Sequence, residues 1–492
     1  MRIVSALTRR PIFVVTTVGV FTFLFSVALW SWRIPVPSNV DEFANLLTAD
    51  TFAHLRLTNP THPLWTHFET IHVFHTPHYA SKFPPLPGAI MALGQVLFGQ
   101  PIVGVWLSTA LACAAVSWML MGCMPRRWAM LGGVLAALHP IVWLWNQHYF
   151  AANLGVLGGA LMVGSVLRIV RSPKPRDGVW LALGVAVVAN TRPYEGFALV
   201  VICLAWIFFQ GRGKPLREAL LPAACGLVLV AAAMGYYNWR VTGDATRLPY
   251  QVYEAQYEIA SPFWFLPARS APVYRHASLQ AFHEWEYAWW KAQHNHFDPR
   301  LVAIKLLRLG CYPWSMLGLS LCMLVCAVRK RVVLLALAGL VAFVCAELLA
   351  VWLNPNYTTP AAPLFFLVTT ECLRYLNQLR LPKLGRIGPG LVAAAVLLSV
   401  AGAILGWQPI AIDDSRYGVA RAAILRDLSK LPNKQLVIVQ YPPQHNFFAE
   451  WVYNEADIDA ARVVWAQDMG PQNQELIEYY RDRTVRFLQA NE

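Results

Sequence analysis

Charged residues are scarce in this chain: they make up 14% of its 492 residues, whereas hydrophobic residues make up 57%. A soluble chain of this length carries about 25% charged residues and divides into several domains. The shortage of charge therefore excludes an ordinary multidomain soluble protein. Long apolar runs separated by short basic loops instead predict a polytopic membrane protein.

Several motifs of nucleotide-dependent and hydrolytic enzymes are missing. The sequence has no P-loop, no GxGxxG after a predicted strand, no GxSxG and no HExxH. Neither an ATP-driven pump nor a Rossmann-type enzyme that uses a soluble nucleotide sugar is therefore supported. The nine cysteines lie in or beside apolar segments without CxxC or zinc spacing, which indicates small buried side chains. No metal ligands are predicted, and a divalent cation is the one cofactor left open.

The net charge of +13 does not predict a nucleic-acid partner, because the basic residues are concentrated in short loops between apolar runs. About eleven of these runs are predicted to be transmembrane helices, each near the ~20 residues needed to cross a bilayer. They are residues 11–31, 101–124, 128–147, 151–169, 178–191, 195–210, 218–237, 311–328, 332–353, 361–378 and 388–408. The basic loops then all fall on the side of the N-terminal arginines, which predicts a cytoplasmic N-terminus and an external C-terminus.

Three large segments are predicted to lie outside the membrane: residues 32–100, 238–310 and 409–492. In the first, the spacing of apolar residues after Asn39 predicts a helix over 41–57, and residues 86–98 predict a second helix in the interface. In the last, strands over 435–441, 462–466 and 484–488 and helices over 416–431 and 472–482 predict a small α/β domain. The expected organisation is a mainly α transmembrane domain over 1–408 and a periplasmic α/β domain over 409–492.

The pair Asp41-Glu42, just beyond the first apolar run, is a candidate for chemistry. Carboxylates at a helix N-terminus are favoured by the helix dipole, so a capping charge is one explanation. The other explanation is a general base at the membrane surface. Partial burial beside lipid raises the pKa of a carboxylate, and proton abstraction needs such a group within hydrogen-bond reach.

The order of features in the first outer segment resembles that of the GT-C membrane glycosyltransferases, which take a sugar from a polyprenyl phosphate. These features are one apolar run, the pair Asp41-Glu42, a predicted interfacial helix and the stretch Tyr79-Ala80-Ser81-Lys82-Phe83-Pro84-Pro85. The stretches Asp41–Pro63 and Glu450–Asp459 are similar to RgtA/B/C/D-like bacterial members, which are related to the aminoarabinose transferase and the protein O-mannosyltransferases. The resemblance covers nearly the whole chain.

The resemblance implies a GT-C-like fold and a catalytic role for Asp41, with Glu42 beside it. Asp41 is expected to activate the acceptor hydroxyl for attack at the anomeric carbon. Lys82 is expected to bind the donor phosphate, and the alternative is a lysine that extends its charge from the interface to water. The GT-C enzymes often carry a further carboxylate in the loop that corresponds to residues 145–153, and this chain has none there.

Further polar candidates lie at the predicted outer ends of helices. Arg192 is predicted to bind phosphate or a sugar carboxylate bidentately, and a local ion pair with Glu195 is the alternative. Arg240 is a second candidate for the phosphate, with capping or snorkelling as the alternative. The candidates for substrate binding are Tyr79, His148, Asn153, Tyr194 and Glu195.

These observations predict an inverting glycosyltransferase of the bacterial inner membrane. It is expected to transfer a sugar from a polyprenyl-phosphate donor to a glycolipid, polysaccharide or protein acceptor on the periplasmic face. Membrane lipid, the donor and the acceptor are the expected partners. The alternative is a transporter or flippase for a lipid-linked or anionic solute, which requires polar groups between the spans near mid-bilayer.

Overall fold

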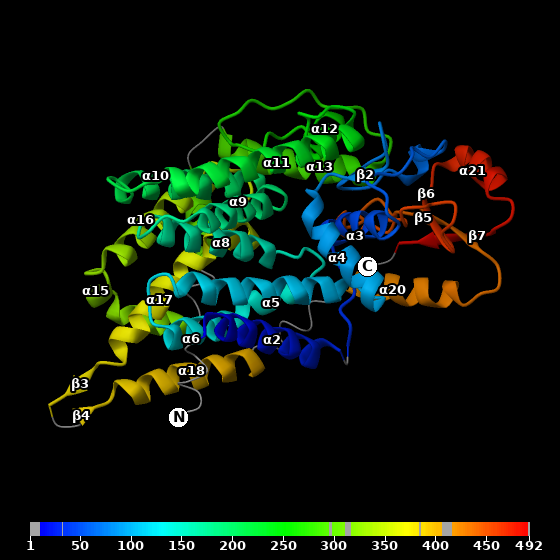
Figure 1. The fold of residues 1–492 in the computed structure, drawn as a ribbon. Helices are drawn as coiled ribbons and strands as arrows, with labels where there is room; N and C mark the ends of the chain where they lie inside the picture. The colour runs from blue at the N-terminus through cyan, green and yellow to red at the C-terminus, as the bar shows by residue number, and fades with distance from the viewer. Residues whose placement is uncertain are drawn as a thin grey trace.

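The computed structural model describes residues 10–31, 33–294, 298–309, 316–382, 385–405 and 416–490. Long helices form a bundle in which most axes run roughly parallel, and a small sheet lies at one end of this bundle (Figure 1). The N-terminal arginines Arg2 and Arg9, the junction between residues 408 and 409 and part of the predicted span 311–328 lie outside the described residues.

The bundle contains most of the helices that the apolar runs predict. They are α2 (Pro11–Trp30), α5 (Pro101–Leu120), α6 (Arg126–Ala137), α7 (Pro140–Asn146), α8 (Asn153–Ile169), α9 (Pro175–Ala189), α10 (Pro193–Gln210), α11 (Arg217–Thr242), α16 (Arg331–Glu347), α17 (Ala362–Leu376) and α18 (Gly388–Leu405). Several of them begin with proline, which suits the first helical position because its missing N–H has no partner there.

The prediction of about eleven spans is not confirmed. Within the described ranges, α2, α5, α10 and α11 are long and apolar enough to cross a membrane, and the bent pair α6–α7 brings the number to at most five. The predicted span 128–147 is broken by 54° because Pro140 cannot continue the hydrogen bonding of α6. In place of a helix over 311–328, the described part of this run holds the 3-10 helix η2 (Met316–Met323) and the short α15 (Leu324–Ala327).

Close packing in the bundle fixes one segment that later contributes to the candidate site. The 3-10 helix η3 (Pro355–Ala361) rests directly on α8, where a Cβ atom added to Gly159 would lie 1.9 Å from the carbonyl oxygen of Pro360. Only glycine permits this approach. Residues 352–357 are therefore held at the end of the bundle.

The first outer segment folds much as its sequence predicts. Helix α3 (Val40–Ala53) begins at a capping box, in which Asn39 accepts from the backbone of the first turn and Glu42 accepts from the backbone of Asn39. The 3-10 helix η1 (Trp65–Phe68), the antiparallel strands β1 (Val73–Phe74) and β2 (Ala80–Ser81), and helix α4 (Pro85–Phe98) follow. The strand pair places residues 72 and 82 side by side, since the backbone N–H of Lys82 donates to the carbonyl of His72 at 3.0 Å.

The second outer segment contains α12 (Pro249–Tyr257), α13 (Ala277–His294) and α14 (Pro299–Leu309). Helix α12 contacts the preceding helix α11 and also strand β1 of the first outer segment. The two outer segments are thus packed against each other, at the end of the bundle that carries α3.

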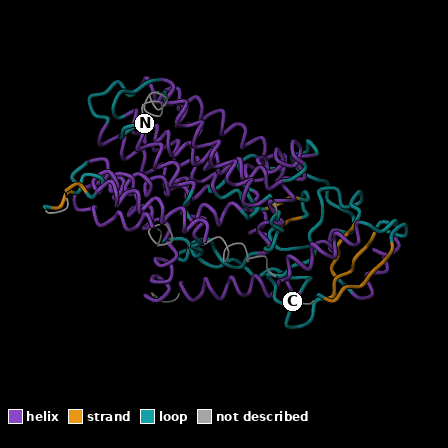
Figure 2. The backbone as a smooth tube through the Cα atoms, turned by 90° about the horizontal axis from the view of Figure 1, so that it is seen from below, coloured by secondary structure: helices purple, strands orange, loops and turns teal. Residues whose placement is uncertain are grey.

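Residues 416–490, here called the C-terminal unit, form an α/β layer. Strands β5 (Gln435–Gln440), β6 (Val463–Gln467) and β7 (Thr484–Gln489) make a parallel sheet in the order β6-β5-β7, accompanied by α20 (Arg416–Ser429), η4 (Gly470–Gln472) and α21 (Asn473–Tyr479). The three predicted strands and two predicted helices are confirmed here. The sheet and the hairpin of β3 (Arg380–Leu381) and β4 (Gly385–Arg386) lie at opposite ends of the molecule (Figures 1 and 2).

Candidate active site

A cavity of about 440 Å³ lies where the two outer segments meet residues 352–357 and the start of α10. Asp41, Lys82 and Arg192 all line this cavity, although they are far apart in the sequence. The structure therefore brings together the predicted base and two of the predicted phosphate ligands. We call this space the site cavity.

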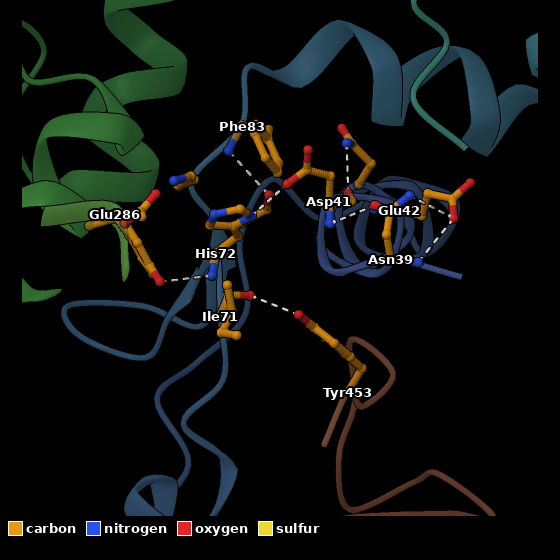
Figure 3. Close-up of polar contacts among 12 residues, drawn as sticks. Asn39, Asp41, Glu42, Ile71, His72, Phe83, Glu286 and Tyr453 are labelled. Atoms are coloured by element: carbon orange, nitrogen blue, oxygen red, sulfur yellow. Dashed lines mark hydrogen bonds and ion pairs between the residues drawn. The ribbon is translucent and has the colours of Figure 1, made fainter. Parts of the chain in front are cut away.

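Asp41 lies in the first turn of α3 and points toward His72 (Figure 3). Its Oδ1 is 2.6 Å from Nδ1 of His72, and 36% of its side chain remains exposed on the cavity side. The imidazole of His72 is almost buried and is surrounded by the rings of Phe83, Tyr253 and Phe282. One carboxylate oxygen of Asp41 is thus held by a histidine, which leaves the other oxygen for a ligand.

The charges around this pair decide its protonation. Burial by itself raises the pKa of Asp41, but His72, Lys82 and Arg192 outweigh burial and bring the pKa below its usual value. Burial lowers the pKa of His72, against the opposing effect of Asp41. At neutral pH Asp41 is therefore ionised and the imidazole of His72 is uncharged. The expectation that burial beside lipid raises the pKa of Asp41 is wrong.

Lys82 is buried on the cavity wall and is already paired. Its Nζ donates to Oε1 of Glu258 at 2.9 Å and lies 4.7 Å from the ring centre of Tyr253. Burial opposes the charge of Lys82, but Glu258 and Glu286 outweigh it and raise the pKa. The same pairing lowers the pKa of Glu258 despite its burial. Both partners are therefore ionised.

Arg192 occupies the N-cap position of α10 and has a different environment. Its guanidinium lies 4.5 Å from the ring centre of Tyr357, and it lines both the site cavity and a smaller adjoining cavity. Among the described residues, no salt bridge within 4.0 Å joins Arg192 to a carboxylate, but Glu195 is the charged group that raises the pKa of Arg192 most. Lys82 has a direct carboxylate partner at 2.9 Å, whereas Glu195 acts on Arg192 from beyond 4.0 Å.

The remaining wall of the site cavity combines aromatic rings with carboxylates. Trp285 of α13 stacks on Trp352 at 5.1 Å, and Phe448 of the C-terminal unit meets Trp285 at 5.1 Å edge-on. We call these three rings the aromatic wall. Glu254 and Glu286 lie in the same lining, paired with Arg269 and His283 respectively. Both apolar faces and hydrogen-bond acceptors thus meet in one space.

Glu42 does not line the site cavity. Its carboxylate is fully buried and accepts from the backbone of Ser38 at 2.7 Å and of Tyr149 at 2.9 Å, with Nδ1 of His148 at 3.1 Å. The structure therefore places Glu42 and His148 in a structural link between α3 and the turn before α8. A catalytic role for Glu42 has no support from this geometry, because every contact of the carboxylate is internal.

Other candidates also lie away from the site cavity. Arg240 is exposed near the end of α11, and Asn153 is buried in the bundle, where it donates to Thr109. Tyr79 donates to the backbone of Asn454, and Tyr194 donates to the backbone of Ala346. Glu195 lies in the first turn of α10 without lining the site cavity. A position near a predicted outer helix end therefore does not by itself predict that a side chain lines the site cavity.

Sequence reasoning missed His72, Glu258 and Glu286. His72 is one of several histidines in the first outer segment, and no spacing distinguishes it. A signal for the second outer segment did exist, because Tyr250, Glu254 and Glu258 recur every fourth residue and therefore share one helix face. Among the described residues, no group of three or more His, Cys, Asp or Glu is arranged to hold a metal ion.

Comparison with known proteins supports the fold. No protein-family model and no curated protein matches the sequence. ArnT from Cupriavidus metallidurans in the apo state superposes with a TM-score of 0.53 at 12% identity, over 96% of this chain and 88% of that chain. The same protein bound to undecaprenyl phosphate gives a TM-score of 0.49 at 12% identity, with 96% and 88% covered.

An archaeal oligosaccharyltransferase is also similar in structure. The enzyme from Archaeoglobus fulgidus, tethered with an acceptor peptide, gives a TM-score of 0.49 at 12% identity over 92% of this chain. This chain spans only 63% of the length of that enzyme. The similarity to apo ArnT shows that the chain has the fold of the GT-C membrane glycosyltransferases, which confirms the resemblance at the level of fold.

Proposed function

We propose that this protein is an inverting glycosyltransferase of the bacterial inner membrane. It transfers a sugar from a polyprenyl-phosphate donor to an acceptor on the periplasmic face, with residues 1–408 as the catalytic membrane domain and 409–492 as a periplasmic domain. The observation that carries the proposal is the convergence of Asp41, Lys82 and Arg192 on one cavity at the end of the helix bundle. A carboxylate and two cations in one space are what transfer from a lipid phosphate requires.

In the proposed reaction, Asp41 acts on the acceptor hydroxyl, and the two cations act on the donor phosphate. The free oxygen of Asp41 takes the proton of the acceptor hydroxyl while the acceptor oxygen attacks the anomeric carbon. The bond from the anomeric carbon to the phosphate oxygen breaks, and its electron pair leaves with the polyprenyl phosphate. Arg192 and Lys82 stabilise the charge of that phosphate. A single displacement of this kind inverts the anomeric configuration.

The donor class is supported by the fold and by the cations. ArnT, whose apo form shares this fold, has also been solved with undecaprenyl phosphate bound. A lipid phosphate needs cationic ligands near the membrane boundary, and Arg192 stands at the start of the apolar helix α10. We assign Arg192 as the main phosphate ligand, because Lys82 must share its charge with Glu258.

The aromatic wall supports a saccharide acceptor in the proposal. The C–H faces of a sugar ring pack on aromatic rings, while sugar hydroxyls donate to carboxylates such as Glu254 and Glu286. A transporter site is less compatible with the structure, because it is expected between the spans near mid-bilayer, whereas the three charged residues meet at the end of the bundle.

The test is transfer by purified protein from a panel of radiolabelled polyprenyl-phosphate sugars to saccharide acceptors. Asp41→Asn is expected to keep folding and membrane insertion but to lose transfer, because an amide cannot accept the proton. In the wild type, ionised Asp41 is present above its lowered pKa, so this group should cause no loss of rate between pH 7 and pH 5. Normal turnover by Asp41→Asn in proteoliposomes would remove Asp41 from the role of base.

A further inference from the structure

His72 has an unusual backbone conformation at the centre of the candidate site. Its φ angle is 65°, in the left-handed region that residues other than glycine rarely adopt. Such a conformation is strained and persists only where the surroundings hold it in place. The hydrogen bonds around His72 therefore decide whether its imidazole stays against Asp41.

Three hydrogen bonds from three parts of the chain hold this backbone. Tyr453 of the C-terminal unit donates its hydroxyl to the carbonyl of Ile71 at 3.0 Å (Figure 3). The N–H of His72 donates to the hydroxyl of Tyr253 at 2.9 Å. The carbonyl of His72 accepts from the N–H of Lys82 at 3.0 Å. The peptide groups on both sides of His72 are thus fixed.

Tyr453 also contacts the helix that carries Asp41. Its ring stacks on Phe43, two residues beyond Asp41, with centroids 4.6 Å apart and planes 9° apart. Arg421 holds this arrangement from within the C-terminal unit, since it donates to the carbonyl of Tyr453 at 2.8 Å and lies 4.5 Å from the ring centre of Phe43. Tyr453 therefore contacts the residue before His72 through its hydroxyl and the helix that carries Asp41 through its ring.

We propose that Tyr453 is a positioning residue, through which the C-terminal unit holds His72 against Asp41. The proposal deepens the proposed function and rests on it for the chemistry, but its geometric part stands independently. It assigns to the C-terminal unit a direct part in building the site, in addition to the ring of Phe448 on the cavity wall.

Tyr480→Phe provides a matched control. Tyr480 is also buried in the C-terminal unit, and its hydroxyl donates to Asp459 at 2.7 Å and lies 3.2 Å from Nε2 of His62 in the first outer segment. It therefore belongs to the same interface between the unit and the first outer segment but does not reach His72. A general weakening of this interface affects both variants, whereas the proposed positioning affects only Tyr453→Phe.

The first experiment needs no substrate. Purified wild-type protein, Tyr453→Phe and Tyr480→Phe are treated with diethyl pyrocarbonate, which modifies uncharged imidazole, and the rate at His72 is followed by peptide mass spectrometry. The wild-type His72 is buried and is expected to react slowly. Loss of the Tyr453 hydroxyl leaves the Ile71 carbonyl without this partner and is expected to raise the rate at His72 about tenfold. An unchanged rate in Tyr453→Phe, or an equal rise in Tyr480→Phe, overturns the proposal.

The second experiment uses the pH dependence of transfer, and the groups that act on Asp41 set the expected direction. The groups that lower the pKa of Asp41 are His72, Lys82 and Arg192, and the uncharged hydroxyls of Tyr250, Tyr357 and Tyr453 are the other titratable groups near it. When His72 moves away, part of the effect that keeps the pKa of Asp41 low is lost, so that pKa rises. The acid limb of the rate profile is then expected at higher pH in Tyr453→Phe than in Tyr480→Phe. A mere loss of folded protein lowers the rate at every pH without moving the limb.

Tyr253→Phe extends the test to the other side of the same peptide. It removes the acceptor of the His72 N–H from helix α12, so it is expected to accelerate modification of His72 even if Tyr453→Phe does not fold. Slow modification of His72 in a folded Tyr253→Phe contradicts the idea of a held backbone. Absence of any transfer activity in the wild type contradicts the proposed function, while the modification rates still decide the positioning role.

Discussion

Replacement of Arg192 by glutamine is the sharpest test of how the donor phosphate is bound. Arg192 is the cavity cation without a carboxylate within 4.0 Å among the described residues, whereas Lys82 is paired with Glu258 at 2.9 Å. A phosphate therefore displaces no direct carboxylate contact at Arg192, where Glu195 acts from beyond 4.0 Å, but must compete with Glu258 for Lys82. Arg192→Gln removes the charge and keeps an amide of similar reach.

The expected loss follows from the strength of charged hydrogen bonds. One such bond contributes about 1.5–3 kcal/mol, and each 1.4 kcal/mol corresponds to about a tenfold change in affinity. Arg192→Gln is therefore expected to weaken the binding of undecaprenyl phosphate by roughly 10- to 100-fold. The fold should persist, because the guanidinium of Arg192 packs on the ring of Tyr357 and forms no salt bridge within 4.0 Å among the described residues.

The assay is the rise in unfolding temperature of the purified protein with increasing undecaprenyl phosphate, since a ligand stabilises the state that it binds. Arg240→Gln is the matched control, because Arg240 is an exposed arginine near an outer helix end that does not line the site cavity. Arg240→Gln is expected to bind like the wild type. Wild-type binding by Arg192→Gln, or an equal loss in both variants, refutes the assignment of the phosphate site.

Two further predictions concern the aromatic wall and Glu42 in the first turn of α3. Trp285→Ala is expected to raise the KM for a saccharide acceptor about 2- to 12-fold through the loss of about 0.5–1.5 kcal/mol of stacking. Trp285→Phe is expected to retain most of the affinity, and equal KM values in both variants would exclude the aromatic wall from acceptor binding. Glu42→Gln is expected to lower stability by about 1–3 kcal/mol, because its buried carboxylate links Ser38, Asn39 and Tyr149, while the binding of undecaprenyl phosphate stays unchanged. Thermal unfolding measures the loss of stability. If Glu42→Gln has an unaltered melting temperature but no transfer activity, Glu42 has a catalytic role and the structural assignment is wrong.

Local sequence patterns predicted the elements outside the bundle well. The helix after Asn39 was predicted because a capping residue precedes an apolar repeat of helical period, and α3 begins where this signal lies. The strands predicted over 435–441, 462–466 and 484–488 are found at 435–440, 463–467 and 484–489, because short runs rich in β-branched residues are separated by helical segments. In these cases the information lies within about ten neighbouring residues.

The bundle and the site depend on information that is not local. The predicted span 128–147 ignored Pro140, and the count of spans relied on hydropathy where several helices are short. Asp41, Lys82 and Arg192 were identified from a family resemblance and from charge at predicted helix ends. His72 could not be identified, because only tertiary packing brings one histidine among many to Asp41 and holds its backbone in the left-handed region.

Residues near the start of the chain are in direct contact with residues of the C-terminal unit. Asp50 accepts from the backbone of Ala456, and Arg56 meets Asp457, across separations of 406 and 401 positions. During synthesis, the helix that bears Asp41 emerges long before the residues against which it finally rests. A product shortened by a premature stop after Leu405 and ahead of Tyr453 would keep helices α2 to α18 and still lack this support.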